Sequence, residues 1–199
     1  MTIQQDPEFV ITLQRVIEFV GTFAFALSGI RLAASKHYDW LGGFVCGIAV
    51  AIGGGTIRDV MLGLRPFWML SPIYILCTMM AQLVVIVCHN YLKRLDNTWF
   101  LFDTLGLALF NIAGIQKTLD CGFPFWVAII MGCITGAAGG VIRDVLLNEE
   151  PVIFRKEIYA MACVAGGMAY WLLSYLGVSL YVTVIVAFLM VCAIRLLAV

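Results

Sequence analysis

Long apolar stretches separated by short polar segments run along almost the whole chain. A helix needs about 20 predominantly apolar residues to cross the hydrocarbon core of a membrane. The connecting segments are too short to fold as separate domains, and the boundary before the last stretch is marked only by Gly177. The pattern predicts an all-α integral membrane protein with seven transmembrane helices, at residues 12–34, 40–62, 69–90, 99–117, 124–147, 155–176 and 178–197.

Composition supports this prediction and excludes several classes of function. The 199 residues are 63% hydrophobic and 12% charged, and their mean hydropathy is +1.02. Soluble domains are about 45–50% apolar and about 25% charged, so a soluble fold of this size could not hide so much apolar surface. The formal net charge is zero and no basic face is present, which argues against nucleic acid as a partner.

The sequence carries no pattern of residues that indicates an enzyme. The seven cysteines are scattered, with no metal-ligand spacing and no disulfide framework. No phosphate-binding loop and no nucleophile paired with a base is present. We therefore expect no enzymatic activity, no cofactor and no bound metal. The N-terminal segment lacks the Lys and Arg residues of a cleavable signal peptide, so we expect the first helix to be retained.

The distribution of Lys and Arg near the ends of the spans predicts the orientation of the chain. Cytoplasmic segments of membrane proteins are enriched in these residues. Seven of them lie on the side that holds the first, third and fifth connections and the C-terminus, and three lie near the span ends on the opposite side. Seven against three places the N-terminus outside and the C-terminus in the cytoplasm.

An internal repeat extends through the first six spans. A shift of 85 residues aligns GGTIRDVML at 54–62 with GGVIRDVLL at 139–147, and other matched pairs continue in the same register. The predicted units are a first repeat at 12–90, a second at 97–176 and a separate helix at 178–197. Because each repeat has three spans, the second must enter the membrane from the opposite side, as in the inverted repeats of many transport proteins.

Each repeat carries a glycine cluster followed by Arg-Asp in its second span. Glycine weakens a helix interior, so these clusters favour a kink or unwinding beside a permeation path. Close packing of helices through small residues is an alternative that the sequence leaves open. The residues concerned are Gly53, Gly54, Gly55, Arg58 and Asp59 in the first repeat, and Gly139, Gly140, Arg143 and Asp144 in the second.

Acidic residues in the first span of each repeat are the expected partners of these arginines. Glu18 lies on the outer side with Arg58, and Asp103, its match at the same offset, lies on the inner side with Arg143. We expect Glu18 near Arg58 and Asp103 near Arg143, at the two ends of one polar pathway, with the seventh span outside it. Two alternatives remain: the arginines could extend to the lipid headgroups, and Glu18 could pair locally with Arg15. Weaker candidates for lining a cavity are Lys117, Ser28, Asn111 and Thr135.

The doubled motif, with a proline after each copy in a chain of about 200 residues, resembles the prokaryotic relatives of the trimeric intracellular cation (TRIC) channels, which are also labelled UPF0126 or glycine transporter domain proteins. The resemblance covers the whole chain. It implies a homotrimer in the lipid membrane with one pore in each protomer, conducting K⁺ in preference to Na⁺, and lined and gated by glycine-kinked helices 2 and 5. The second repeat departs from the first by having Ala138 in place of Gly53. The Lys-Glu-Val lipid-binding motif of the animal channels is missing from this sequence.

Two functions therefore compete at this point. The first is a passive channel for monovalent cations. The second is a secondary transporter of glycine or a similar small zwitterion, whose carboxylate an arginine and exposed backbone groups could bind. An arginine in a cation pore requires neutralisation by nearby acids such as Asp59 and Asp144, or a movement of the arginine during gating.

Overall fold

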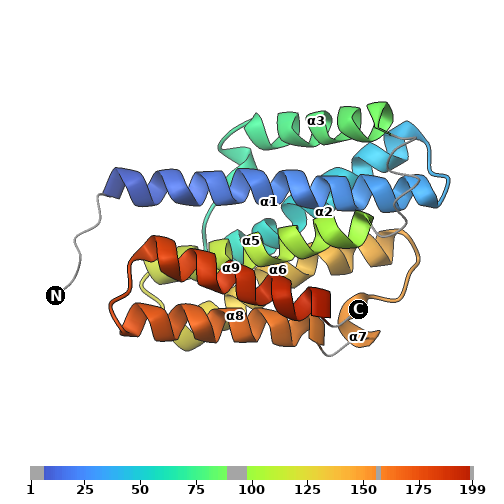
Figure 1. The fold of residues 1–199 in the computed structure, drawn as a ribbon. Helices are drawn as coiled ribbons and strands as arrows, with labels where there is room; N and C mark the ends of the chain where they lie inside the picture. The colour runs from blue at the N-terminus through green and yellow to red at the C-terminus, as the bar shows by residue number, and fades with distance from the viewer. Residues whose placement is uncertain (1–6, 89–97, 156–157, 198–199) are drawn as a thin grey trace.

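A computed structural model describes residues 7–88, 98–155 and 158–197 and consists of helices in this part of the chain (Figure 1). Six helices are long and apolar enough to span a membrane, and α3 is a shorter apolar helix. The seven-helix membrane fold is thereby confirmed. The seven apolar helices are α1 (Pro7–Ser35), α2 (Trp40–Met61), α3 (Ile73–Val87), α5 (Thr98–Asp120), α6 (Phe125–Leu146), α8 (Ile158–Tyr175) and α9 (Leu180–Leu197). Two single-turn helices, η1 (Phe67–Met69) and α7 (Val152–Arg155), lie between them.

The third and sixth predicted spans begin too early. The helix predicted at 69–90 is α3, which begins only at Ile73, because Pro72 disfavours helical backbone in the residue before it. The helix predicted at 155–176 is α8, which begins at Ile158 after the short helix α7. Residues 89–90 and 156–157 lie outside the described part of the chain. The short helices η1 and α7 occupy equivalent places in the two repeats.

Short turns connect the helices and depend on residues suited to them. Gly63, Gly122 and Gly177 follow α2, α5 and α8 with φ between 71° and 82°, a backbone conformation that glycine adopts without steric cost. At the start of α2, the backbone N–H of Gly42 donates to Asp39 Oδ1 at 2.6 Å, which caps the helix. Gly177 thus separates α8 from α9 despite the weak signal in the sequence.

The two repeats have opposite orientations, as Figure 1 shows: α1 runs antiparallel to α5, α2 to α6, and α3 to α8. Helices α1, α2, α5 and α6 pack together in the centre of the bundle. Helix α3 packs on α1 and α2, and α8 packs on α5 and α6 in the same manner. Helix α9 has no equivalent and packs on α5 and α8.

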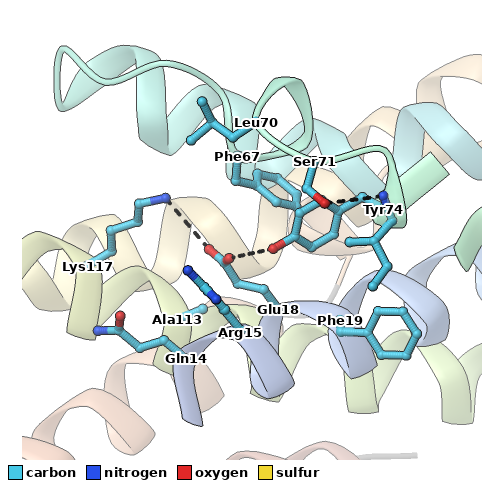
Figure 2. Close-up of a pocket in the computed structure, with 11 residues that line it drawn as sticks. Gln14, Arg15, Glu18, Phe19, Phe67, Leu70, Ser71, Tyr74, Ala113 and Lys117 are labelled. Carbon is cyan, nitrogen blue, oxygen red and sulfur yellow. Dashed lines mark hydrogen bonds and ion pairs between the residues drawn. The ribbon is translucent and has the colours of Figure 1, made fainter. Parts of the chain in front are cut away.

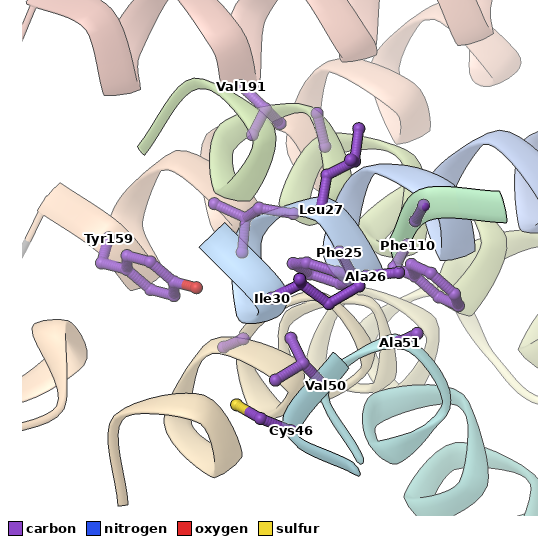
Figure 3. Close-up of a cluster of buried hydrophobic side chains, with 14 of the residues drawn as sticks. Phe25, Ala26, Leu27, Ile30, Cys46, Val50, Ala51, Phe110, Tyr159 and Val191 are labelled. Atoms are coloured by element: carbon purple, nitrogen blue, oxygen red, sulfur yellow. The ribbon is translucent and has the colours of Figure 1, made fainter. Parts of the chain in front are cut away.

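Two phenylalanines at equivalent positions meet at the centre of this arrangement (Figure 3). The rings of Phe25 on α1 and Phe110 on α5 stack with centroids 5.3 Å apart and an interplanar angle of 20°. A Cβ atom on Gly21 would lie 2.9 Å from the Phe110 ring, and one on Gly106 would overlap the Phe25 ring. Each glycine therefore makes room for the phenylalanine of the other repeat, and the pair marks the axis that relates the repeats.

The glycine clusters bring α2 and α6 into direct backbone contact. A Cβ atom on Gly54 would overlap the carbonyl oxygen of Thr135, and one on Gly139 would lie 2.8 Å from the carbonyl oxygen of Val50. Both segments are α-helical throughout, so unwinding of the glycines is not present in this structure. The alternative of close packing through small residues describes their role here.

Candidate functional site

Four charged side chains form a cluster where α1, α2 and α5 meet, which we call the Glu18 cluster: Glu18, Arg58, Asp59 and Lys117. Arg58 donates from Nη2 to Glu18 Oε1 and from Nε to Asp59 Oδ1, both at 2.8 Å. Lys117 Nζ lies 3.1 Å from Asp59 Oδ1 and 3.8 Å from Glu18 Oε1. The predicted proximity of Glu18 and Arg58 is therefore confirmed.

The Glu18 cluster borders a cavity of about 520 Å³ between α1, α3, α5 and the loop that contains η1 (Figure 2). Glu18 faces this cavity and accepts a hydrogen bond from the Tyr74 hydroxyl at 3.2 Å. Lys117 extends toward Glu18 from the opposite side, and Arg15 lines the cavity beside them. The cavity thus exposes both an acid and two cations at one end of the bundle.

A second cluster lies at the opposite end of the bundle, and we call it the Asp103 cluster: Asp103, Arg143, Asp144 and Arg195. Arg143 donates from Nη1 to Asp103 Oδ1 at 2.6 Å and from Nε to Asp144 Oδ1 at 2.9 Å. Arg195 donates from Nη2 to Asp103 Oδ2 at 2.8 Å. The predicted proximity of Asp103 and Arg143 is confirmed as well.

The loop after each Arg-Asp pair fixes the aspartate. The backbone N–H of Phe67 donates to Asp59 Oδ2 at 2.7 Å, and the N–H of Val152 donates to Asp144 Oδ2 at 3.1 Å. Phe67 and Val152 are equivalent in the two repeats, and each follows the proline that ends the motif. Each aspartate thereby joins the end of its long helix to the short helix that follows.

Both arginines are fully buried, so they do not extend to the lipid headgroups. Arg58 and Arg143 each have 0% relative exposure. A charge removed from water needs partners of opposite sign, and charged groups within membrane spans are found paired in this way. Each cluster contains two cations and two carboxylates, so its formal charge is zero. This balance removes the electrostatic objection to an arginine at the end of a cation pathway.

The two clusters differ in their supporting contacts. In the Asp103 cluster, Arg143 Nη1 also donates to the hydroxyl of Ser28 at 2.8 Å. The equivalent residue in the second repeat is Ala113, which has no hydroxyl, and Arg58 Nη1 is buried without a hydrogen-bond partner among the described residues. Arg143 therefore makes three side-chain hydrogen bonds and Arg58 makes two, although each arginine also has one terminal nitrogen without a hydrogen-bond partner among the described residues.

Two cations in these clusters were not identified by the repeat. Lys117 was only a weak candidate, because it could equally have satisfied a neighbouring carbonyl; its equivalent in the first repeat is Leu32, so the repeat gives no support for it. Arg195 was missed, because α9 has no equivalent within the repeats, but it joins the Asp103 cluster by binding Asp103. One signal could have revealed them. Each repeat places two acidic residues beside one arginine, and neutrality of such a buried set requires a second cation.

The remaining predicted residues take packing positions. Cβ atoms on Gly53, Gly55 and Gly140 would overlap Ile142, the Phe67 ring and the Tyr159 hydroxyl, respectively. Arg15 does not replace Arg58 as the partner of Glu18 and lines the cavity. The weaker candidates Asn111 and Thr135 satisfy backbone carbonyls, those of Cys163 at 3.2 Å and Met131 at 2.5 Å.

Comparison with known proteins gives a consistent family. A family model described as "Glycine transporter" matches the chain twice, at residues 15–90 and 100–175. The inner membrane protein YadS of Escherichia coli, of the group named UPF0126, is 41% identical over 157 residues, which cover 77% of this chain and 75% of YadS. A UPF0126 membrane protein of Vibrio cholerae is 40% identical over 172 residues, which cover 84% of this chain and 71% of the relative.

Solved structures agree with this assignment. The TRIC trimeric intracellular cation channel orthologue from Rhodobacter sphaeroides is similar with a TM-score of 0.88 and 30% identity, over 94% of this chain and 96% of that one. The chain belongs to the TRIC/UPF0126 family. A second TRIC cation channel structure matches with a TM-score of 0.80 and 34% identity, over 92% of this chain and 91% of that one. As a member of the TRIC/UPF0126 family, the chain is a multi-pass membrane protein.

Proposed function

We propose that this TRIC/UPF0126 protein is a channel for monovalent cations, with K⁺ preferred over Na⁺. The observation that carries the proposal is the similarity of the whole fold to a protein described as a trimeric intracellular cation channel, over 94% of this chain. The proposed assembly is a homotrimer in the prokaryotic inner membrane, surrounded by lipids. Each protomer contains one conduction pathway, and its N-terminus is outside and its C-terminus cytoplasmic.

The proposed pathway runs through the centre of the protomer, from the Glu18 cluster to the Asp103 cluster. Both clusters consist of buried ion pairs at equivalent positions of inverted repeats, and inverted repeats commonly place a transport site at their interface. We infer that this arrangement is a non-conducting state, because ion pairs bridge the helices at both ends of the proposed pathway and the Phe25–Phe110 stack lies between them. Ions would require separation of these contacts.

The glycine clusters are the proposed hinges of this movement. In α2 and α6 they lie between the centre of each helix and its Arg-Asp pair, so bending there would displace one cluster relative to the core. Gly53, Gly54 and Gly55 in α2, and Gly139 and Gly140 in α6, have backbone that bends at lower cost than other residues. We propose that bending at these positions separates α2 from α6 and gates the pathway.

Recording from purified protein in planar bilayers tests the proposal. With K⁺ on one side and Na⁺ on the other, we expect discrete conductance steps and a reversal potential that favours K⁺. Substitution Arg58→Ala should change conductance or open probability, whereas Lys36→Gln, which removes an exposed cation paired with Glu149, should not. A purified trimer without cation current would refute the channel.

A second candidate function is transport of glycine or a similar zwitterion. The cavity beside the Glu18 cluster favours it, because Glu18 can face an ammonium group while Lys117 and Arg15 face a carboxylate. The description of the matching family model points in the same direction. Saturable exchange of radiolabelled glycine across proteoliposomes, in the absence of conductance steps, would favour this transporter over the channel.

A further inference from the structure

Arg195 lies in the last turn of α9, outside the repeats, but it turns into the protein. An arginine near the end of a membrane helix normally extends to the headgroups and keeps its charge in water. Arg195 instead has 3% relative exposure. Its position therefore needs a reason other than the general enrichment of basic residues at the ends of spans.

The guanidinium of Arg195 contacts residues near the N-terminal ends of two other helices. It donates to Asp103 Oδ2 at 2.8 Å, and its central carbon lies 4.6 Å from the centroid of the Phe100 ring, both on α5. The same atom lies 4.3 Å from the centroid of the Tyr159 ring on α8. A desolvated guanidinium is attracted to the face of an aromatic ring, so both ring contacts add to the ion pair. Arg195 thus joins the ends of α5, α8 and α9.

Comparison of the repeats shows what Arg195 replaces. In the Glu18 cluster, the second carboxylate oxygen of Glu18 accepts the hydroxyl of Tyr74. Tyr159 is equivalent to Tyr74, but its hydroxyl is buried without a hydrogen-bond partner among the described residues. The corresponding oxygen of Asp103 is bonded to Arg195 instead. The neutral hydroxyl of Tyr74 binds the acid at one end of the bundle, and the charged Arg195 takes the same place at the other end.

We propose that Arg195 is a positioning residue through which α9 holds the Asp103 end of the pathway closed. It neutralises the surplus acid of the Asp103 cluster, so that Asp103 stays bonded to Arg143 without hydration. Without Arg195, one cation and two carboxylates would remain buried, and the cluster would hydrate and separate. This inference rests on the proposed pathway, but its first consequence, access of water to the Asp103 cluster, does not require ion conduction.

A natural thiol reports on that access. Cys46 on α2 is 4% exposed, and its backbone packs against Gly29 on α1, the residue after Ser28, whose hydroxyl accepts a hydrogen bond from Arg143. In proteoliposomes, we expect Arg195→Gln to increase the labelling rate of Cys46 by a water-soluble methanethiosulfonate reagent by about tenfold, because a buried unpaired charge strongly destabilises the closed arrangement. Arg195→Lys should restore the slow rate. Mass spectrometry of the Cys46 peptide separates this thiol from the other six cysteines.

Lys117→Gln is the matched control, because it removes the additional cation of the other cluster. It should leave the labelling of Cys46 unchanged. Cys77, which donates to the carbonyl oxygen of Phe19 near the Glu18 cluster, provides the reverse check, and Arg195→Gln should not accelerate its labelling. A uniform increase at both thiols would indicate general loosening of the fold and would overturn the proposal.

Bilayer recordings of the same variants complete the test. Arg195→Gln should raise the open probability with little change in unitary conductance, since Arg195 holds the gate and does not line the pathway. Wild-type protein without current, together with accelerated Cys46 labelling in Arg195→Gln, would refute the channel but retain the role of Arg195. Unchanged Cys46 labelling in a folded Arg195→Gln protein would refute that role, whatever the conductance.

Discussion

The contact between α2 and α6 predicts that alanine at Gly54 is destabilising although alanine favours helices. A Cβ atom there would overlap the carbonyl oxygen of Thr135 and lie 3.2 Å from its carbonyl carbon, so backbone and not a flexible side chain must move. Overpacking of this kind costs about 1–3 kcal/mol. The gain in helix propensity from glycine to alanine is about 1 kcal/mol.

Because backbone must move, we take the upper part of the overpacking range, about 2–3 kcal/mol. The net loss for Gly54→Ala is then about 1–2 kcal/mol, which lowers the thermal midpoint by several degrees in a chain of this size. Gly43→Ala on the same helix is the matched control. The nearest atom to a Cβ atom there lies 3.7 Å away, so the substitution keeps its gain in propensity. Thermal unfolding of both variants in the same detergent measures the difference. If Gly54→Ala were as stable as Gly43→Ala, the proposed backbone contact would be wrong.

Three further tests of the two clusters use thermal unfolding, two of them with a control variant. Arg58→Met should cost about 3–5 kcal/mol, because it leaves two buried carboxylates with one cation, whereas Lys36→Gln at an exposed ion pair should stay within about 1 kcal/mol; equal effects would contradict the burial of the cluster. Tyr74→Phe should cost about 1.5–3 kcal/mol through its lost hydrogen bond to a carboxylate, and Tyr159→Phe, which loses none, should be close to neutral; the reverse order would refute the assigned difference between the repeats. Ser28→Ala should lower stability by about 1–2 kcal/mol, because it removes a buried acceptor from a guanidinium; an unchanged midpoint would show that this bond is not formed.

The helices and the central ion pairs were predictable because both depend on patterns within the repeats. Apolar length located the spans, and the offset of 85 residues matched Glu18 with Asp103 and Arg58 with Arg143. The inverted topology then placed each acid on the side of its arginine. These inferences needed only the hydrophobicity of the spans, the odd number of spans in each repeat and the sequence similarity between the repeats.

The supporting contacts were not predictable because they break the symmetry of the repeats. Arg195 comes from a helix that the repeat does not contain, and Lys117 has an apolar equivalent in the first repeat. The role of the glycines was also undetermined, since the same residues suit a bend or a close contact. Only the three-dimensional arrangement shows that Gly54 and Gly139 lie against carbonyl oxygens of the facing helix.

Of the two additional cations, Lys117 belongs to the second repeat and Arg195 lies outside both repeats. The first and second halves of the chain therefore differ in whether two copies of the same half could neutralise their own buried charges. A homodimer of the first half alone would place Leu32 where Lys117 stands, and each end would carry one uncompensated buried negative charge. A homodimer of the second half would bring its own Lys117 to each end and would be balanced without Arg195. The halves are therefore not interchangeable as building blocks: on electrostatic grounds the second half is self-sufficient, and the first depends on being fused to it.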